Sequence, residues 1–417
     1  MVFSTSSRYV VVATIVCVLL SGCLITTAAK DQLVVWHWEA HARGDFAKWL
    51  EYAKLSFEKS HPEVEVTYEY VPFGPDRLVI AASANVVPDV SIASAYYARD
   101  LYESGLLQPV NELYAATPDL ERSLLPVTQL FNQHEGVIYG ATNSLEARAI
   151  LYNHQQLAEA GLDNDPLAIK TWDDFSDAVR KLTRFADDGK VRRAGYFEPV
   201  NKDALTSWLY SNGASFSDEA QTRAVFNTDK GRQTLTFQRD LWNLTGAVSG
   251  FSANFAQGNV SMQLLETAVG HIPGIEPAEF GYTSVPTGPA GTSRGSVAWG
   301  NMYVIPAGAK HPQLAWDWIV HYTSLESQIK QLEICRMPIS PRRDLYSSSA
   351  WRAMVSKHPH MSTALDIFQL AGAAPFYRGS AIDKEINPIL RKVFTNKMAP
   401  EAAMEQMESI VNRLLAR

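Results

Sequence analysis

The segment Trp36-His37-Trp38-Glu39 places two indole rings, an imidazole and a carboxylate next to one another near the start of the chain. A carbohydrate has C–H faces that pack on flat aromatic rings, and hydroxyl groups that hydrogen-bond to carboxylates, amides and guanidinium groups. In a strand, Trp36 and Trp38 would point to the same side, so at least one of them is expected in the core. We predict that Trp38 and Glu39 contact a ligand, with packing in the core or at the surface as the alternative, and that His37 is structural.

Two other chemistries use the same residue types. Tyr96 and Tyr97, with the histidine and carboxylate of the first segment, offer hard ligands that suit a ferric ion. The later part of the sequence holds no matching cluster. Glu39 and Glu146 are carboxylates of the kind that glycosidases use, but a retaining enzyme needs them about 5 Å apart and nothing in the sequence marks such a pair. A ferric-ion or other small-solute receptor and a surface carbohydrate-active enzyme therefore stay as alternatives to a non-catalytic receptor for hydroxyl-rich solutes.

The first segment lies at the end of a predicted strand. Residues 33–36 are apolar, and residues 64–71 alternate between apolar and polar side chains, as in a strand with one exposed face. Between them, apolar residues from Phe46 to Phe57 recur at helical spacing. These elements form a strand-helix-strand unit. The loop that holds Trp38 and Glu39 then lies at the carboxyl end of a parallel strand, where open α/β sheets bind ligands.

Strands and helices continue to alternate along the rest of the chain. Residues 88–93 form a predicted strand that leads into Tyr96. Thr171 is the predicted N-cap of a helix, because Asp174 three residues later completes a capping box. Further strands are expected at 262–265, 280–286 and 302–305, and further helices at 229–242, 313–322 and 400–415. The sequence contains no repeat of solenoid length.

The N-terminus has the order of a bacterial export signal. Arg8 precedes an apolar run from Tyr9 to Leu20 that is too short to cross a bilayer, and small residues follow. Leu20-Ser21-Gly22-Cys23 fits a lipobox, in which residues 1–22 are removed and Cys23 carries a diacylglycerol. Cleavage after Ala29 is the alternative. In both cases we expect the body of the protein to be exported to the cell envelope outside the cytoplasmic membrane. With the lipobox it would also be anchored there.

Composition restricts the class of protein further. A chain of 417 residues exceeds what one hydrophobic core usually organises, so two lobes are expected. Removal of residues 1–22 leaves 36 basic and 44 acidic side chains, a net charge of −8, which argues against nucleic acid or an anionic membrane surface as a partner. Cys335 then has no intramolecular cysteine partner, which excludes a disulfide framework and a cysteine-based zinc site. We expect Cys335 to be buried.

Five separated blocks of sequence follow one another along the chain. They are Leu33 to Trp38 with Phe57 to Pro62; Pro88-Asp89-Val90 with Ser104 to Leu107; Gly136 to Gly140; Leu151-Tyr152-Asn153 and Ala160-Gly161-Leu162 with Thr171 to Phe175; and Gly300 with Ile305-Pro306, Lys310 to Pro312 and Ala315-Trp316. Together, and in this order, they resemble the extracellular solute-binding proteins of family 1. These are the sugar-type receptors of ABC importers, to which maltose-binding protein belongs.

The resemblance implies an α/β fold of the periplasmic-binding-protein type (type II), with two lobes, a ligand cleft between them and crossover hinge strands. The N-terminal lobe would comprise residues 31–142 plus 293–337, and the C-terminal lobe residues 143–292 plus 338–417. The implied function is the substrate-binding component of an ABC importer. It would close on a carbohydrate or sugar-like polyol, without catalysis or a cofactor, and deliver it to a membrane permease. A monomer is expected.

The resemblance also assigns candidate ligand-binding residues by position. Tyr96 and Tyr97 match cleft positions, and Glu146 matches a sugar-binding glutamate with which Arg148 would simply pair. The other candidates are Asn143, Trp208 (with its neighbours Asn201, Asp203 and Thr206), Trp299, Asn301, Tyr377 and Arg378.

One departure from the family pattern concerns a stacking ring. Many relatives carry Gly-Pro-Trp after the stretch that matches Gly258 to Met262, and the indole packs on the sugar. This chain has Glu266-Thr267-Ala268 instead. Because a carboxylate replaces the ring, we expect Glu266 to bind a hydroxyl or an amine, or else to face solvent.

Overall fold

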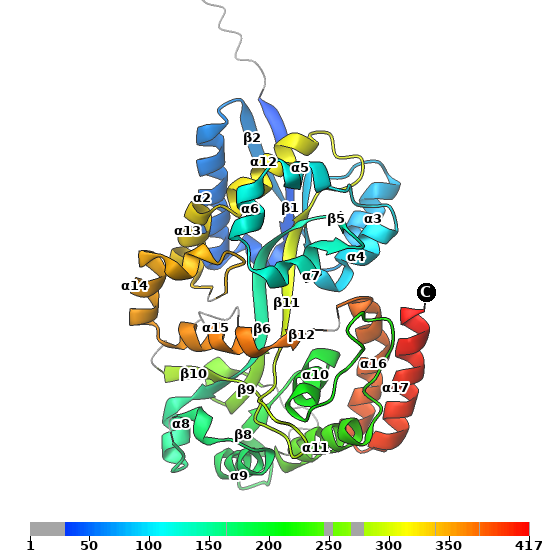
Figure 1. Cartoon of the computed structure of the whole chain (residues 1–417). Coiled ribbons are helices and arrows are strands. Elements are labelled where there is room, and N and C mark those ends of the chain that lie inside the picture. The colour runs from blue at the N-terminus through cyan, green and yellow to red at the C-terminus, as the bar shows by residue number, and fades with distance from the viewer. Residues whose placement is uncertain are drawn as a thin grey trace, which may run out of the picture.

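The computed structural model describes residues 30–163, 165–245, 253–267, 279–337, 339–374 and 376–416. The predicted signal sequence, with Cys23 and the alternative cut at Ala29, lies outside these residues. The chain forms two α/β halves, one above the other in Figure 1, and strands β6 and β11 run from one to the other. We call the half that holds β1 the first half, and the half that holds α9 the second half. Within the described ranges, no helix is both long and apolar enough to cross a membrane.

Among the described residues, one mixed sheet of ten strands extends through both halves. Its order is β2-β1-β3-β11-β6-β9-β8-β7, with β10 paired to β6 and β12 paired to β11. The strands are β1 (Asp31–Trp38), β2 (Val64–Val71), β3 (Val90–Ser94), β6 (Ala141–Asn153), β7 (Arg184–Phe185), β8 (Val191–Phe197), β9 (Val260–Glu266), β10 (Phe280–Thr283), β11 (Val297–Val304) and β12 (Gly372–Ala373). A separate hairpin pairs β4 (Gln133–His134) with β5 (Val137–Ile138).

Strand β6 belongs to both halves. Residues 141–147 pair antiparallel with β11, and residues 148–153 pair antiparallel with β9 and β10. Strand β11 in turn runs antiparallel to β3, which lies parallel to β1 in the first half. The two halves are therefore connected by continuous hydrogen-bonded strands.

The first half folds as the apolar spacing predicts. Leu33 and Val35 of β1 and Phe57 of α2 are fully buried, and β1 and β2 are parallel over their whole lengths. The predicted strand-helix-strand unit is confirmed. Cys335 is buried, as expected. The helices of this half are η1 (Glu39–Ala42), α2 (Gly44–Ser60), α3 (Asp76–Ser83), α4 (Ala95–Glu103), α5 (Asn111–Ala115), α6 (Pro118–Ser123), η2 (Pro126–Thr128), α7 (Gln129–Asn132), α12 (Pro312–Tyr322) and α13 (Leu325–Cys335).

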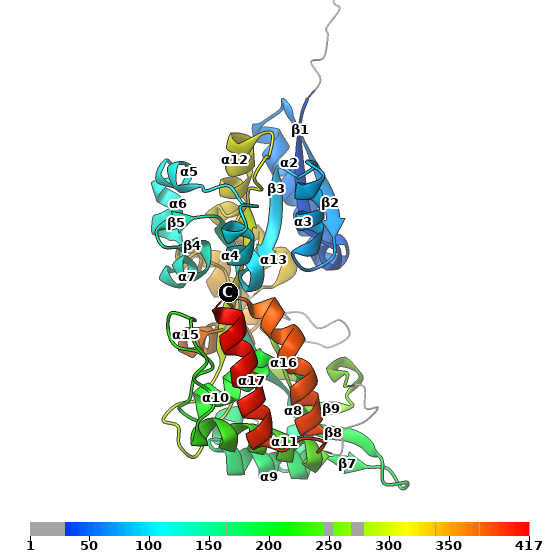
Figure 2. The same cartoon turned by 90° about the vertical axis from the view of Figure 1, so that its right-hand side faces the viewer.

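The second half contains the predicted capping box. The Thr171 hydroxyl accepts a hydrogen bond from the Asp174 backbone N–H at 3.2 Å, and the Asp174 carboxylate accepts one from the Thr171 N–H at 2.9 Å. Helices α16 and α17 pack on each other and on α11 along one side of this half (Figure 2). The helices are α8 (His154–Glu159), η3 (Pro166–Ala168), α9 (Trp172–Leu182), α10 (Lys202–Ser211), α11 (Asp229–Thr245), η4 (Phe255–Gln257), α16 (Gly379–Phe394) and α17 (Pro400–Leu415).

The segment after α13 contacts both halves before it reaches the second half at α16. Helices η6 (Asp344–Ser347) and α14 (Ser349–Lys357) pack on α13 of the first half, where Leu345 and Trp351 share an apolar core with Leu332. Helix α15 (His360–Leu370) then packs on β6 and β10. The chain therefore contacts the first half through α14 and the second-half strand β10 through α15 before it forms α16.

The core of the second half encloses a carboxylate. Glu198 is fully buried; its Oε2 accepts hydrogen bonds from the Tyr196 hydroxyl at 2.8 Å and the Trp208 indole N–H at 2.7 Å, and its Oε1 accepts one from the Gln238 amide at 3.0 Å. Burial raises the pKa of Glu198 from its ordinary value of 4.5 to about 7, against the lowering effect of these hydrogen bonds. Trp208 has no exposed surface. The prediction that Trp208 contacts a ligand is wrong, because its ring is a core element.

Replacing Glu198 with glutamine is expected to stabilise the protein above pH 7 and to change little at pH 4. An acid whose pKa is raised by folding keeps its proton longer in the folded state, so the wild type loses stability as the pH rises from about 4.5 to about 7. Glutamine stays neutral, and Gln238, whose Oε1 has no partner, can turn its amide to accept the new N–H. The gain should be about 2–3 kcal/mol at pH 8.

Urea unfolding of both proteins at pH 4 and pH 8 measures this effect. Comparison with the wild type at each pH cancels the titration of all other groups. If Glu198→Gln changes the free energy of unfolding by the same amount at pH 4 and pH 8, Glu198 does not cause the pH dependence.

Candidate ligand-binding site between the two halves

One face of the sheet carries a row of polar and aromatic side chains where β6 passes between the halves. Glu146 and Arg148 are two residues apart on β6 and therefore point to the same face. Trp299 on β11 lies directly opposite Glu146, and Glu266 on β9 lies directly opposite Arg148. Directly opposed positions on paired strands bring side chains into contact. The register of the sheet thus gathers four side chains from three distant parts of the sequence.

A hydrogen bond from Asn301 positions Glu146, and the surroundings of Glu146 raise its pKa. The Asn301 side-chain amide donates to Glu146 Oε1 at 2.9 Å and to Ser144 Oγ at 3.2 Å. Burial, and then the negative charge of Glu266, raise the pKa of Glu146 to about 7, while the Asn301 hydrogen bond and Arg148 lower it by less. The carboxyl group is therefore partly protonated at neutral pH, and it can both accept and donate a hydrogen bond.

Arg148 pairs with carboxylates other than Glu146. Its guanidinium donates to Glu266 Oε1 at 2.6 Å and lies 3.8 Å from Asp203 Oδ2, and its Cζ is 5.1 Å from the ring centre of Trp299. The side chain is buried, and its Nε–H has no hydrogen-bond partner among the residues that the structure describes. The expected pairing of Arg148 with Glu146 is therefore replaced by a bridge between β9 and α10.

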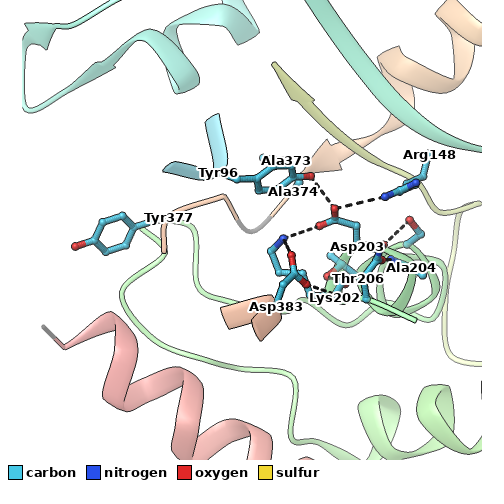
Figure 3. Close-up of polar contacts among 12 residues, drawn as sticks. Tyr96, Arg148, Lys202, Asp203, Ala204, Thr206, Ala373, Ala374, Tyr377 and Asp383 are labelled. Atoms are coloured by element: carbon cyan, nitrogen blue, oxygen red, sulfur yellow. Dashed lines mark hydrogen bonds and ion pairs between the residues drawn. The ribbon is translucent and has the colours of Figure 1, made fainter. Parts of the chain in front are cut away.

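Helix α10 of the second half adds a buried ion pair to the cluster. Lys202 Nζ lies 3.2 Å from Asp203 Oδ1 and 2.8 Å from Asp383 Oδ2, and the lysine has no exposed surface (Figure 3). Burial lowers the pKa of Lys202, but the two carboxylates raise it by more, so the ammonium stays charged. Since Asp203 also approaches Arg148, the charges form one continuous network.

Tyr96, on α4 of the first half, reaches this network across the gap between the halves. Its hydroxyl donates to Asp203 Oδ2 at 2.7 Å, and Lys202 Nζ lies 4.0 Å from its ring centre (Figure 3). Its ring is 6.0 Å from that of Trp299. Burial, followed by the charge of Asp203, raises the pKa of Tyr96 well above its ordinary value. Tyr96 is therefore a neutral hydrogen-bond donor that links the first half to the second.

Tyr377 and Arg378 form a second connection between the halves. The Tyr377 hydroxyl donates to Glu103 Oε2 at 3.2 Å, and the Arg99 guanidinium lies 3.8 Å from the Tyr377 ring centre. Arg378 Nε lies 3.5 Å from Asp100 Oδ1. Both predicted ligand residues thus contact α4 of the protein itself, and their contact with a solute remains a prediction.

A cavity of about 620 Å³ lies between the halves next to these contacts. Its volume falls within the range of small-molecule sites, about 300–1,000 Å³. Residues of both halves line it, among them Arg99, Gln133, Tyr210, Asp218, Gln221 and Phe376. Amide, carboxylate and aromatic groups are therefore available to a polar solute of this size.

The aromatic residues near the end of β1 form a separate group. Trp38 and Tyr97 are buried in the core, and their ring centres lie 4.9 and 5.9 Å from that of Phe73. Phe73 is 62% exposed, so it covers the other two rings and presents an open aromatic surface. Phe73 was not among the predicted residues. Its Pro-Phe-Gly-Pro loop directly after a strand is the sequence feature that could have indicated an exposed ring there. Glu39 is exposed at the start of η1, next to this group.

The structure brings five of the predicted ligand residues into one cluster: Tyr96, Glu146, Glu266, Trp299 and Asn301. Asn143 is outside it. This residue is buried at the bulge where β6 and β11 change register, and its side-chain amide nitrogen has no partner. Arg148 and Asp203 were predicted only as neighbours of site residues, and Lys202 and Asp383 were not predicted at all. Charged residues are mostly exposed, so a sequence gives no reason to expect a buried lysine or its partner.

Two halves joined by crossing strands, with a polar and aromatic cluster between them, define a two-lobed solute-binding protein. The family model of the bacterial extracellular solute-binding proteins matches residues 40–329. The chain belongs to this family, which confirms the resemblance seen in the sequence. Members of the family bind solutes and are not enzymes.

Curated relatives are distant in sequence. The maltotriose-binding protein of Pyrococcus abyssi is 21% identical over 283 residues, which cover 66% of this chain and 59% of that protein, so the match spans less than two thirds of the relative. An uncharacterised ABC transporter extracellular-binding protein of Pyrococcus horikoshii is 24% identical over 454 residues, covering 98% of this chain and 96% of that protein.

Solved structures confirm the fold. The GacH receptor of Streptomyces glaucescens, described unliganded and with acarbose, has a TM-score of 0.77 at 20% identity and covers 93% of this chain and 99% of its own. The ABC substrate-binding protein of Listeria monocytogenes in complex with cycloalternan has a TM-score of 0.80 at 18% identity, with the same coverage. The expected two-lobed α/β fold of periplasmic binding proteins is therefore correct.

Proposed function

We propose that this protein is the substrate-binding component of an ABC importer and that it binds a carbohydrate or sugar-like polyol between its halves for delivery to a membrane permease. The row of Glu146, Arg148, Glu266 and Asn301 beside Trp299 carries this proposal. A carboxyl group that accepts and donates, an amide and a guanidinium match the hydroxyl rim of a sugar, and the indole matches its C–H face. A solute that lacks one hydroxyl would leave a buried group unpaired, which gives selectivity.

We further propose that the halves act as lobes that close on the solute. The first lobe would comprise residues 31–142 plus 293–337, and the second lobe residues 143–292 plus 338–417. Within the last range, residues 344–357 pack on α13 of the first lobe. The hydrogen bond from Tyr96 to Asp203 joins groups of opposite lobes at 2.7 Å. Contacts of this kind exist only in the closed form, so they favour the shape that a permease would recognise.

We propose that a diacylglycerol on Cys23 anchors the protein, as a monomer, to the outer face of the cytoplasmic membrane. The family is extracellular, and the lipobox sequence supports the anchor. Mass spectrometry of the N-terminal peptide of the mature protein distinguishes an acylated Cys23 from a free terminus that follows cleavage after Ala29.

A panel of saccharides tests the proposed function. Thermal unfolding and small-angle scattering are measured with and without mono-, di- and trisaccharides of gluco, galacto and manno configuration. We expect at least one sugar to raise the melting temperature and to reduce the radius of gyration, because it binds both lobes. If neither quantity changes with any saccharide, the protein is not a sugar receptor.

The two alternatives receive no support from the site. The Tyr96 hydroxyl donates a hydrogen bond to Asp203, and the buried ring of Tyr97 packs against Phe73, so both tyrosines are engaged by the protein itself. A hydrolase is contradicted by the family to which the chain belongs. A non-catalytic sugar receptor is therefore the function that the site favours.

A further inference from the structure

The charges of the cluster between the halves do not balance. Among the residues that the structure describes there, Glu146, Asp203, Glu266 and Asp383 are acidic, and Arg148 and Lys202 are basic. Lys202 is occupied by Asp203 and Asp383 at 3.2 and 2.8 Å. Arg148 remains as the counter-charge of both Glu146 and Glu266, while it is also 3.8 Å from Asp203. With every group ionised, the cluster carries two more negative than positive charges.

The positive groups are covered, whereas Glu266 is partly exposed and Glu146 is covered less completely than either cation. The side chains of Lys202 and Arg148 are 0% and 7% exposed, whereas that of Glu266 is 37% exposed and Glu146 is half-buried. A solute that enters between the halves therefore meets the carboxylates of Glu146 and Glu266 before it meets either cation. Tyr96 and Trp299 cover the same network from the side of the first half.

The hydrogen bonds leave one acceptor on each of these carboxylates. Within the described part of the chain, Asn301 donates to Oε1 of Glu146 and Arg148 donates to Oε1 of Glu266. The second oxygen of each group can therefore accept from a solute. The buried Nε–H of Arg148 has no partner and can donate to a solute oxygen. The site thus offers two carboxyl acceptors, of which Glu146 becomes fully ionised when a positive charge binds beside it, and one donor.

We propose that the solute carries a protonated amine in addition to its hydroxyl groups, as amino sugars and amine-bearing polyols do. This inference rests on the proposed function as a sugar receptor. The ammonium would lie between Glu146 and Glu266 and donate to their open oxygens, while a neighbouring hydroxyl accepts from Arg148. A neutral sugar would leave two like charges together in a closed cleft of low dielectric, and a uronic acid would add a third.

Calorimetry with matched sugars tests the proposal at pH 6.5, where the amine is charged. The probes are di- and trisaccharides of glucosamine, galactosamine and mannosamine, each compared with its N-acetyl form, its parent hydroxyl sugar and its uronate. We expect one amine form to bind at least tenfold tighter than all three matched analogues. A hydroxyl or N-acetyl sugar that binds as tightly as its amine form overturns the amine proposal and leaves the sugar receptor standing. Absence of binding by every saccharide overturns both.

Isosteric variants locate the preference in the two carboxylates. Glu266→Gln keeps an oxygen for Arg148, and Glu146→Gln keeps one for Asn301, but each removes one negative charge. Each variant is expected to reduce the preference for the amine over the hydroxyl sugar at least fivefold, because its loss of affinity for the amine sugar exceeds its loss for the hydroxyl sugar. Glu112→Gln, at an exposed position of α5, serves as the matched control and should behave as wild type. An unchanged preference in both site variants would overturn the assignment.

Proton release provides an independent measurement. Glu146 faces Glu266 on β9, Arg148 on its own strand, Asn301 on β11 and, through Arg148, Asp203 on α10. An ammonium bound beside Glu146 favours the ionised form of this carboxyl group, whose pKa burial and the charge of Glu266 raise to about 7, so it displaces the proton of Glu146. Titrations in two buffers of different ionisation enthalpy should therefore show proton release with the amine sugar. Proton uptake or no exchange would contradict the proposed position of the amine.

Discussion

A Lys202→Met variant is expected to have a free energy of unfolding about 3–5 kcal/mol lower than wild type at pH 7. The lysine side chain is fully buried, and its ammonium lies 3.2 and 2.8 Å from Asp203 and Asp383. Methionine keeps a long apolar chain but removes the charge. Asp383 would then lose the cation beside it, and Asp203 would keep only the more distant Arg148, 3.8 Å away. Removal of one partner of a buried ion pair is strongly destabilising because it leaves charge uncompensated. Urea unfolding followed by tryptophan fluorescence measures the loss.

The pH dependence separates this mechanism from a simple packing defect. Burial already raises the pKa of Asp383, and the charge of Lys202 opposes that rise. Without Lys202 the pKa of Asp383 would rise further, so the folded variant would bind a proton more readily than the unfolded chain. The loss of stability is therefore expected in full at pH 7 and should shrink as the pH falls toward 4. Lys330→Met is the control, since its partner Glu333 lies at the surface, 3.0 Å away. A loss no larger than that of the control, or one independent of pH, would contradict the role of Lys202.

A Glu146→Ala variant is expected to bind its saccharide more than tenfold more weakly, a loss of about 1.4 kcal/mol or more. The change removes an acceptor of the solute and leaves the Asn301 amide without its partner at 2.9 Å. Because burial already disfavours the ionised form of this carboxyl group, its removal should not destabilise the fold. Calorimetry with a saccharide selected from the panel, together with the melting temperature of the variant, measures both effects.

The matched control for this variant is Glu112→Ala, which removes an exposed carboxylate outside the cluster. Glu146→Gln keeps the hydrogen bond with Asn301 and should lose less affinity for a neutral sugar than the alanine variant does. If Glu146→Ala retains wild-type affinity and melts like wild type, Glu146 does not belong to the binding site.

Much of the fold could be predicted, because local patterns specify it. The two-residue alternation of β2 and the capping box of Thr171 identify their elements directly. The sequence blocks also gave the correct fold, since they occur in the order that the topology requires. The packing of α14 on α13 was not predicted, because nothing in the sequence near residue 338 shows it.

Four of the five predicted residues that cluster in the candidate site lie on paired strands, and Tyr96 lies on α4. Glu146, Trp299 and Glu266 come together because paired strands align them. Trp208 was misplaced because a tryptophan on a helix near a predicted cleft can point into the core as readily as out of it, and its indole N–H binds the buried Glu198.

The buried lysine of α10 could not be found from sequence. Lysine is among the residues least often buried, and Lys202 is buried because Asp203 and Asp383 neutralise it. Asp383 follows Lys202 by 181 residues, so its proximity is a tertiary effect. Phe73 was missed for a related reason, since exposure of an aromatic ring depends on the loop that carries it.

The shared strand β6 has a consequence for how the molecule unfolds. Its first residues are hydrogen-bonded to β11 and its last to β9 and β10, so neither half keeps a complete sheet without it. Melting of one half would leave backbone N–H and C=O groups of the other unpaired. The two halves should therefore denature in a single cooperative transition. A solute bound at Glu146 would then protect the whole chain, including segments far from the cleft, from extracellular proteases.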